Sequence, residues 1–276
     1  MSNPVSVVIP TAGATGSVGG DQRVFVTEAV RSVIRTGGPN VEAIVVVTDD
    51  RCSRDVRSEL VRQGAMVVLD DRPFNFSSRI NLGVAVVTTP QVLLLNDDIE
   101  AGADGWLDEM ASASAVAGGG PVGACLVYED GRVQHLGQVF AAGLPGHLLA
   151  GRPLTDPRVI DFRSEDRVCS ALTAACLLMG VELFGEVGGM SPAFPINYND
   201  TDLCLKARRS GARCTVATGA LLSHYESRSR DAAVTDAEIR QLWRRWWGEM
   251  HHEEYWRDDA RALARQLGLD PPEDWT

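Results

Sequence analysis

The first 100 residues alternate short apolar segments with amphipathic segments, and no other feature of the chain constrains the fold as strongly. The short apolar segments are typical of strands buried on both faces, whereas the amphipathic segments have the 3.6-residue apolar period of helices. This order predicts a mostly parallel sheet with helices on both faces. The predicted strands are residues 5–10, 43–47, 65–69 and 92–95, and the predicted helices are residues 24–34, 53–63 and 79–87.

Acidic residues gather directly after the strand predicted at residues 92–95. Asn96 comes first, and Asp97, Asp98 and Glu100 follow it. Like charges at one strand end repel, and a bound divalent cation with oxygen ligands is the usual remedy. A surface turn rich in aspartate is the ordinary alternative, and an isolated Asp-Asp pair does not decide between them.

Two other predicted strands also end in polar residues. Thr11 follows the first strand, and Asp49 follows the second. Ligands of parallel sheets bind beyond the carboxyl ends of the strands. The sequence therefore indicates a ligand site to which Thr11, Asp49, Asp97 and Asp98 contribute.

The chain is less regular beyond residue 100. Residues 122–128 and the turn after them predict a hairpin. Residues 144–161 are rich in Gly and Pro and predict a long surface loop, a candidate substrate lid. Residues 168–179 predict one buried apolar element, and residues 202–210 predict a helix.

The last predicted strand, residues 215–222, is followed closely by His224. After residue 230 the composition changes to one long polar and aromatic helical region, residues 236–267. We therefore expect an α/β domain over residues 1–230 and a C-terminal helical extension over residues 231–276.

Composition excludes several classes of protein. The net charge of −11 argues against nucleic acid as a partner, because no basic field would attract phosphates. The six cysteines include no Cys-x-x-Cys pair and predict reduced core residues. The sequence shows no signal peptide, and no apolar run reaches the roughly 18 residues of a membrane span. We expect a cytoplasmic protein without a transmembrane segment.

The glycines at positions 13, 16 and 19 follow a predicted strand and suggest a dinucleotide-binding turn. Their spacing is not Gly-x-Gly-x-x-Gly, however, and Pro10 interrupts the turn. The chain also lacks the Tyr-x-x-x-Lys pair of hydride-transfer enzymes. A dehydrogenase is therefore a poor interpretation of this loop.

A series of short motifs runs along residues 4–230 in a characteristic order. They are Val-Ser-Val-Val-Ile-Pro-Thr (5–11), Pro-Phe-Asn-Phe-Ser (73–77), Asn-Leu-Gly (81–83), Leu-Asn-Asp-Asp-Ile-Glu (95–100), Asp-Gly-Arg-Val-Gln-His-Leu-Gly (130–137), Val-Gly-Gly-Met (187–190), Tyr-Asn-Asp-Thr-Asp-Leu-Cys-Leu (198–205) and His-Tyr-Glu-Ser-Arg-Ser-Arg (224–230). Together they resemble family 2 glycosyltransferases, and in particular the bacterial rhamnosyltransferase-like members. The resemblance implies the GT-A fold, a Rossmann-like mixed α/β sheet flanked by helices, here with a C-terminal helical extension.

The resemblance also implies a reaction and its main participants. A sugar would move from a nucleotide-diphosphate sugar to an acceptor hydroxyl with inversion, assisted by Mg²⁺ or Mn²⁺. Asp98 and His224 match the metal ligands, and Asp200 matches the general base. Many relatives carry Glu before that base, where this chain has Asn199.

A nucleotide-binding set follows from the same resemblance. Its members are Thr11, Asp49, Arg79, Asn81, Asp97 and Arg228. Asp49 would contact the base, and Arg228 would contact the diphosphate. The acceptor would be a glycan, a lipid-linked sugar or a small molecule, and the sequence identifies neither it nor the sugar.

Two kinds of alternative stay open at the level of sequence. One is a non-catalytic module that binds sugar nucleotides, and the other is a sugar-nucleotide pyrophosphorylase, although its N-terminal Gly- and Lys-bearing signature is absent. The tryptophan-rich segment around Trp246 has alternatives too. Core packing is the default, and a homodimer contact or a contact with the inner face of the membrane are the others.

Overall fold

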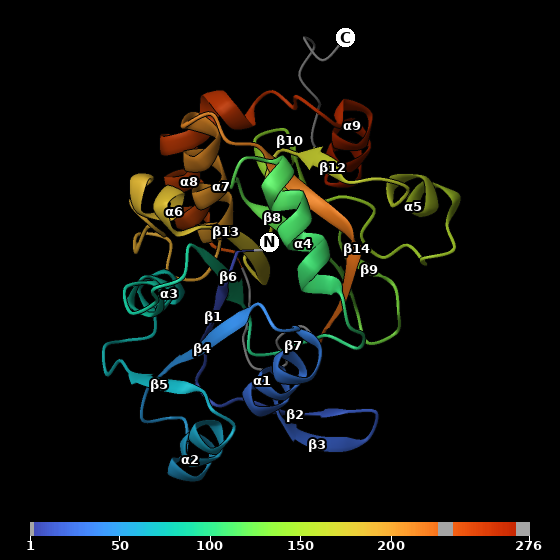
Figure 1. Cartoon of the computed structure of the whole chain (residues 1–276). Helices are drawn as coiled ribbons and strands as arrows, with labels where there is room; N and C mark the ends of the chain where they lie inside the picture. Colours follow the sequence, from blue (N-terminus) through green and yellow to red (C-terminus); the bar gives the residue numbers. More distant parts are fainter. Residues whose placement is uncertain (1–2, 226–233, 269–276) are drawn as a thin grey trace.

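The computed structural model describes residues 3–225 and 234–268. Its central sheet has the strand order β12-β14-β8-β13-β6-β1-β4-β5 (Figure 1). These strands are β12 (Arg167–Cys169), β14 (Cys214–His224), β8 (Val122–Val127), β13 (Cys176–Gly180), β6 (Gln91–Leu95), β1 (Val5–Pro10), β4 (Val41–Thr48) and β5 (Met66–Leu69). Two short strands, β7 (Ile99–Glu100) and β9 (Val133–His135), pair with β14 and β8.

The half of the sheet formed by β6, β1, β4 and β5 is parallel, as the alternation of strands and helices predicts. Side chains of each strand alternate between two apolar layers. On β6, for example, Val92 and Leu94 face one layer, and Leu93 and Leu95 face the other. Because both faces are covered, β1, β4 and β6 consist mostly of apolar residues.

Helices cover both faces of the sheet. One apolar layer contains α1 (Phe25–Thr36) and α4 (Trp106–Val116), and the other contains α3 (Phe76–Val84) and α7 (Asn199–Arg209). The expected α/β architecture with a mixed sheet is confirmed. Helices α2 (Arg54–Arg62) and α6 (Val181–Glu186) also belong to this region.

The glycine-rich segment after β1 contains a hairpin that the sequence did not predict. Its strands are β2 (Thr15–Val18) and β3 (Asp21–Val24). Gly19 and Gly20 form the turn with φ angles of 59° and 93°. Two successive residues with positive φ are typical of the two-residue turn that suits the twist of paired strands, and glycine adopts them without strain.

Three other predicted boundaries were wrong. The helix expected from residue 79 begins at Phe76, because the Asn75 side chain caps it by accepting from Ser78 N. The apolar run at residues 168–179 is divided between β12 and β13. The predicted surface loop at residues 144–161 contains β11 (Leu144–His147), which pairs with β10 (Gln138–Ala141), and α5 (Pro157–Phe162).

The predicted C-terminal helical region is two helices, α8 (Asp236–Met250) and α9 (Arg257–Gln266). Buried Glu253 occupies the break between them. Its carboxylate accepts from the main-chain N–H groups of Phe140, Tyr255 and Trp256 and from the Ser170 hydroxyl. These bonds explain why one helix cannot continue, since they hold the intervening backbone in another conformation.

Helix α8 packs against α7 through Trp246. The indole is fully buried, and its Nε1 donates to Asp202 Oδ1 at 2.8 Å. Arg245 Nε lies 3.1 Å from the same oxygen. Core packing is therefore the structural role of Trp246, whereas Trp247, on the same helix, is 45% exposed.

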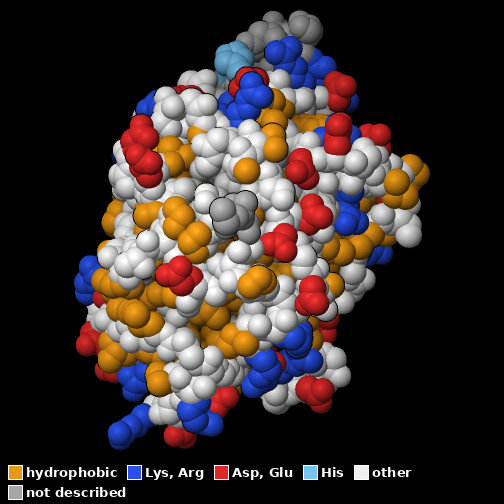
Figure 2. All heavy atoms as spheres, viewed as in Figure 1, with side chains coloured by type: hydrophobic (Ala, Val, Ile, Leu, Met, Phe, Trp, Pro, Cys, Tyr) orange, Lys and Arg blue, Asp and Glu red, His pale blue; other side chains and the backbone are white. Residues whose placement is uncertain are grey.

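Figure 2 shows apolar side chains gathered on the lower left of the view, where Figure 1 draws α3 and β5. Met66 and Leu69 are exposed on β5, the edge strand of the sheet. The strand is only four residues long, which limits pairing with another sheet. All six cysteines are buried and free, as predicted. Within the described residues, no helix is both long and apolar enough to cross a membrane.

The buried tryptophan of α8 gives a test of how firmly the C-terminal helices belong to the fold. We expect Trp246→Ala to lower the free energy of unfolding by about 3–5 kcal/mol, because it removes a buried ring and the indole donor to Asp202. Trp247→Ala should cost about 1 kcal/mol or less. Urea unfolding followed by circular dichroism measures both, and equal costs would contradict this assignment.

Candidate active site

The polar residues at the strand ends meet because their strands run in the same direction. β1 is parallel to both β4 and β6, so Thr11, Asp49 and Asn96 leave the sheet at one edge. β14 also runs parallel to β6, since β8 is antiparallel to β13 and parallel to β14, and β13 is antiparallel to β6. His224, the last residue of β14, therefore reaches the same edge.

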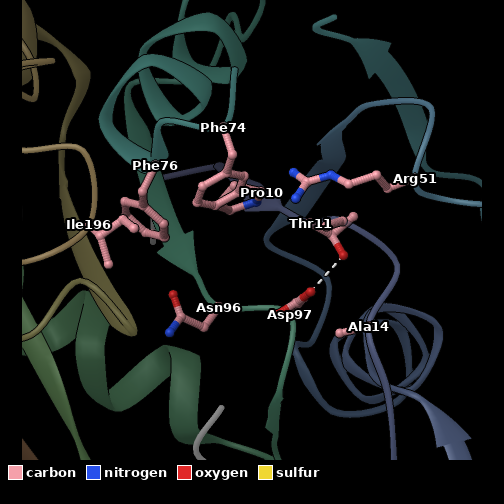
Figure 3. Close-up of a pocket in the computed structure, with 10 residues that line it drawn as sticks. Pro10, Thr11, Ala14, Arg51, Phe74, Phe76, Asn96, Asp97 and Ile196 are labelled. Carbon is pink, nitrogen blue, oxygen red and sulfur yellow. Dashed lines mark hydrogen bonds between the residues drawn. The ribbon is translucent and has the colours of Figure 1, made fainter. Parts of the chain in front are cut away.

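A cavity of about 300 Å³ opens at this edge. Figure 3 shows Phe74 and Phe76 on one side of it, Thr11 and Arg51 on another, and Asp97 pointing toward Thr11. The Thr11 hydroxyl donates to Asp97 Oδ2 at 2.5 Å. The complete lining consists of Pro10, Thr11, Ala12, Ala14, Arg51, Phe74, Phe76, Asn96, Asp97 and Ile196.

Two arginines hold the Asp49 carboxylate beside this cavity. Arg51 donates from Nη2 to Oδ2 at 2.6 Å and from Nε to Oδ1 at 3.1 Å, and fully buried Arg79 also donates to Oδ2. Hydrogen bonds from Arg51, and then from Arg79, hold the pKa of Asp49 well below its usual range, although burial opposes this shift. Asp49 is therefore a fixed anion that orients both guanidinium groups.

Arg79 connects this carboxylate to the end of β1. Its Nη1 donates to the Thr11 carbonyl oxygen at 2.7 Å, and its guanidinium lies 4.6 Å from the centre of the Phe74 ring. Arg51 lies 5.5 Å from the same ring. Phe74 thus contacts two cations at the cavity wall.

The register of β7 against β14 brings Asp98 to His224. Ile99 pairs with His224, and Tyr225 N donates to the Asp98 carbonyl oxygen at 3.0 Å. The Asp98 carboxylate then lies 3.1 Å from His224 Nε2, and both side chains are nearly buried. Two residues that are 126 positions apart (224 − 98) therefore form one polar pair.

Asp200 stands at the start of α7, beside a second, smaller recess. The recess measures about 100 Å³, and its walls include Asn96, Thr173 and Asp200. It shares Phe76, Asn96 and Ile196 with the larger cavity, so the two hollows adjoin. The chain enters α7 through Tyr198, whose φ of 62° lies in the left-handed region that L side chains rarely adopt.

The surroundings of Asp200 favour its neutral form. Asp200 is half-buried and lines the recess. Burial raises the pKa of Asp200 above its ordinary value, while hydrogen bonds from the main chain of Thr201 and from Thr173, and the nearby His147, moderate the rise. A carboxylate with a raised pKa is a stronger base than an ordinary aspartate.

A pair of histidines, His135 and His147, lies next to the recess through the contact of His135 with Thr173. His135 is fully buried, and its Nε2 accepts from Thr173 N at 3.3 Å. Its Nδ1 lies 3.1 Å from His147 Nδ1. Burial lowers the pKa of His135 well below its usual value, so this ring is neutral.

Two members of the predicted nucleotide-binding set do not join the others. The Asn81 side chain accepts from Met190 N at 2.9 Å and donates to Met190 O at 2.8 Å, so it fixes the segment after α6. It does not line the cavity. Arg228 lies outside the described residues.

Sequence reasoning missed Arg51 and gave Phe74 and Phe76 no role of their own. Arg51 stands two residues after Asp49, and this spacing is the signal that would have found it, because a side chain at that position can reach back to the carboxylate. Ile196 carries no signal in its sequence context. It enters the lining only through tertiary packing against Phe76.

No protein-family model matches the chain. An uncharacterised protein, y4gI of Sinorhizobium fredii (strain NBRC 101917 / NGR234), is 35% identical over 259 residues, which cover 88% of this chain and 27% of that protein. The O-antigen biosynthesis protein RfbC of Myxococcus xanthus is 31% identical over 173 residues, 61% of this chain and 13% of that protein. The chain therefore spans about a quarter or less of the length of these relatives.

Solved structures identify the architecture. GalNAc-T7 with UDP, GalNAc and Mn²⁺ superposes with a TM-score of 0.67 at 15% identity, over 90% of this chain and 50% of that one. The mannosyltransferase PcManGT of Pyrobaculum calidifontis, with GDP-Man and Mn²⁺, gives 0.54 at 12% identity, over 100% and 82%. The fold is that of the GT-A glycosyltransferases. At such low identity the likeness concerns the fold alone.

The buried arginine gives a test of the Asp49 cluster. We expect Arg79→Met to lower the free energy of unfolding by about 2 kcal/mol or more, because it strands a buried carbonyl and removes a charged donor. Arg72→Met removes an Arg–Asp pair in which the arginine is exposed and its partner, Asp70, is buried, and it should cost less, about 1 kcal/mol. Urea unfolding of the two variants compares them, and an equal loss would argue against a buried cluster.

Proposed function

We propose that this protein is an inverting, metal-assisted glycosyltransferase that moves a sugar from a nucleotide-diphosphate sugar to an acceptor hydroxyl. One observation carries the proposal: the large cavity, the Asp98–His224 pair and Asp200 meet at one sheet edge, and the cavity and the Asp200 recess share their walls. A donor in the first hollow would present its sugar to an acceptor in the second.

The large cavity suits the nucleotide. Its aromatic wall, Phe74 and Phe76, offers an apolar surface for a base, and the Asp49–Arg51 pair at the rim offers polar groups to read the base edge. The Thr11–Asp97 pair on the opposite wall suits the ribose hydroxyls. Arg79 would act indirectly, by holding Asp49 and the end of β1 in place.

The chemistry of Asp98 and His224 fits Mg²⁺ or Mn²⁺. A carboxylate oxygen and an imidazole nitrogen that face each other are a usable pair of ligands for such a cation. Residues 3–225 and 234–268 bring together no three His, Cys, Asp or Glu side chains as a metal site. The remaining ligands would therefore be diphosphate oxygens and water, the usual arrangement for Mg²⁺ at substrate phosphates. When bound, the cation would stabilise the departing diphosphate.

Asp200 would act as the general base in a single displacement. The acceptor oxygen forms a bond to the anomeric carbon as the bond from that carbon to the diphosphate oxygen breaks. The electron pair leaves with the nucleoside diphosphate, and the acceptor proton passes to the Asp200 carboxylate. Attack opposite the leaving group inverts the anomeric configuration.

The comparisons support this proposal. GalNAc-T7 and PcManGT, which share the fold, each hold a nucleotide or a nucleotide sugar together with Mn²⁺. RfbC, a relative by sequence, is named for O-antigen biosynthesis. A surface glycan or its lipid-linked precursor is accordingly the class of acceptor that we favour.

A screen of donors tests the proposal directly. We expect one of the UDP-, GDP- or dTDP-sugars to raise the melting temperature in the presence of Mn²⁺, and chelation by EDTA to remove most of that shift. The free nucleoside without phosphates is the control, because it cannot bridge to a cation. The proposal fails if no nucleotide sugar stabilises the protein with or without Mn²⁺.

Replacing the proposed base separates an enzyme from a module that only binds sugar nucleotides. We expect Asp200→Asn to lower kcat by about 10²–10⁴-fold, because the amide cannot take the proton, while donor affinity stays within about twofold. The same change at exposed Asp258 is the matched control and should leave both quantities unchanged. Full turnover by Asp200→Asn would remove this residue from the role.

The raised pKa of Asp200 predicts the acid side of the pH profile. The base acts only when ionised, so turnover should fall as the pH drops through the Asp200 pKa. Because burial raises this pKa, the fall should come at a higher pH than for an ordinary aspartate. The profile of kcat/KM for donor cleavage measures it. A flat profile down to the ordinary aspartate range would contradict the expectation.

A further inference from the structure

Gln134 is a buried glutamine in contact with the proposed metal site. Its Oε1 lies 2.7 Å from His224 Nδ1, and the other ring nitrogen of His224, Nε2, lies 3.1 Å from the Asp98 carboxylate. Gln134 is only 5% exposed. The imidazole is therefore held between an amide oxygen on one edge and a carboxylate on the other.

This arrangement determines where the imidazole carries its proton. An amide oxygen has no hydrogen and can only accept, so Nδ1 must be the donor in the contact with Gln134. In the neutral ring the lone pair is then on Nε2, directed at the Asp98 oxygen. Two acceptors at that distance repel unless a cation or a proton lies between them. The Gln134 contact thus prepares His224 to act as a ligand through Nε2.

The backbone at Gln134 is irregular in a way that serves this contact. On β8 and β9, Val127 pairs with Val133, and the preceding residue of β8, Leu126, pairs with His135. Gln134 is therefore the extra residue of a β-bulge. Such bulges redirect a side chain, and this one lets Gln134 on β9 reach His224 on β14, although β8 pairs with both of those strands.

We propose that Gln134 is a positioning residue that fixes the tautomer and the ring plane of His224 so that Nε2 and Asp98 share one divalent cation. The inference rests on the proposed function, because it assumes that His224 is a metal ligand. Gln134 belongs to the Asp-Gly-Arg-Val-Gln-His-Leu-Gly motif of residues 130–137. The sequence alone indicated no role for this residue.

The physical effect expected is on metal affinity. Groups that accept from the distal N–H of a ligating histidine orient the ring and make it a better ligand, and their loss typically weakens metal binding by about 10–100-fold. A glutamine that merely filled the core would change stability when replaced and leave metal affinity alone. Metal affinity therefore distinguishes the two roles.

The experiment measures binding of Mn²⁺, alone and with UDP or GDP, from the electron paramagnetic resonance signal of free Mn²⁺. Gln134→Leu removes the acceptor and should weaken binding by about 10–100-fold, whereas Gln134→Glu retains an acceptor and should bind nearly as the wild type does. Gln91→Leu is the matched control. Gln91 is also buried and donates to Ser114 Oγ at 2.9 Å, but it lies at the far end of β6 from this edge, so Mn²⁺ affinity should not change.

His224→Ala separates failure of this inference from failure of the proposed function. If His224→Ala loses Mn²⁺ and Gln134→Leu binds it normally, the positioning role is overturned while the metal site stands. If His224→Ala binds Mn²⁺ as tightly as the wild type, or if the wild type binds none, Gln134 has no metal ligand to position. The inference then fails together with the metal-assisted part of the proposed function.

A second measurement needs no variant of Gln134 to fold. The ¹⁵N shifts of His224 in the wild-type protein, assigned by their loss in His224→Ala, report which ring nitrogen is protonated. We expect the proton on Nδ1 and, after Mn²⁺ is added, paramagnetic broadening that is strongest at Nε2. A proton on Nε2 with a bare Nδ1 would show that Gln134 donates through its amide nitrogen, and this would overturn the inference.

Discussion

The site depends first on the parallel direction of β1, β4 and β6. Neighbouring parallel strands need a connection that returns the chain across the sheet, here a helix, and this requirement sends their carboxyl ends to one edge. Strand direction thus brings Thr11, Asp49 and Asn96–Asp98 to the same edge of the sheet. The antiparallel strand β13 does not disturb this edge, because a second reversal at β8 and the parallel pairing of β14 restore the direction.

Charge is the second constraint on this edge. The chain carries a net charge of −11, and several of its carboxylates are buried or nearly so. Three of them are held by specific donors: Asp49 by two arginines, Asp202 by the Trp246 indole and Glu253 by main-chain N–H groups. A negatively charged protein that binds a negatively charged donor needs a local positive charge, and a cation at Asp98 and His224 would supply it. The proposed metal therefore serves binding as well as chemistry.

Much of the fold could be predicted from sequence because it rests on local signals. The buried strands show as uninterrupted apolar runs, and the helices show as apolar periods with recognisable ends. The wrong predictions share a cause, which is contact between segments that are distant in the sequence. Residues 144–161 look like a loop because Gly and Pro are frequent there, yet β11 forms by pairing with β10, and α5 starts at a proline capped by Asp156. The break between α8 and α9 depends on Glu253, whose partners at Phe140 and Ser170 are more than 80 positions away, and no local pattern shows them.

By itself, the sequence determined the alternation of strands and helices over the first 100 residues, the polar residues that follow those strands and the resemblance that linked Asp98, Asp200 and His224. These are properties of neighbours along the chain. Tertiary structure decided which of those residues meet. The register of β7 on β14 brings Asp98 to His224, Arg79 turns inward to Asp49, and Asn81 is bound to Met190 instead of lining the cavity. Hydrogen bonds and ion pairs act over about 3 Å, so they depend on register and packing between distant segments, which no local pattern encodes.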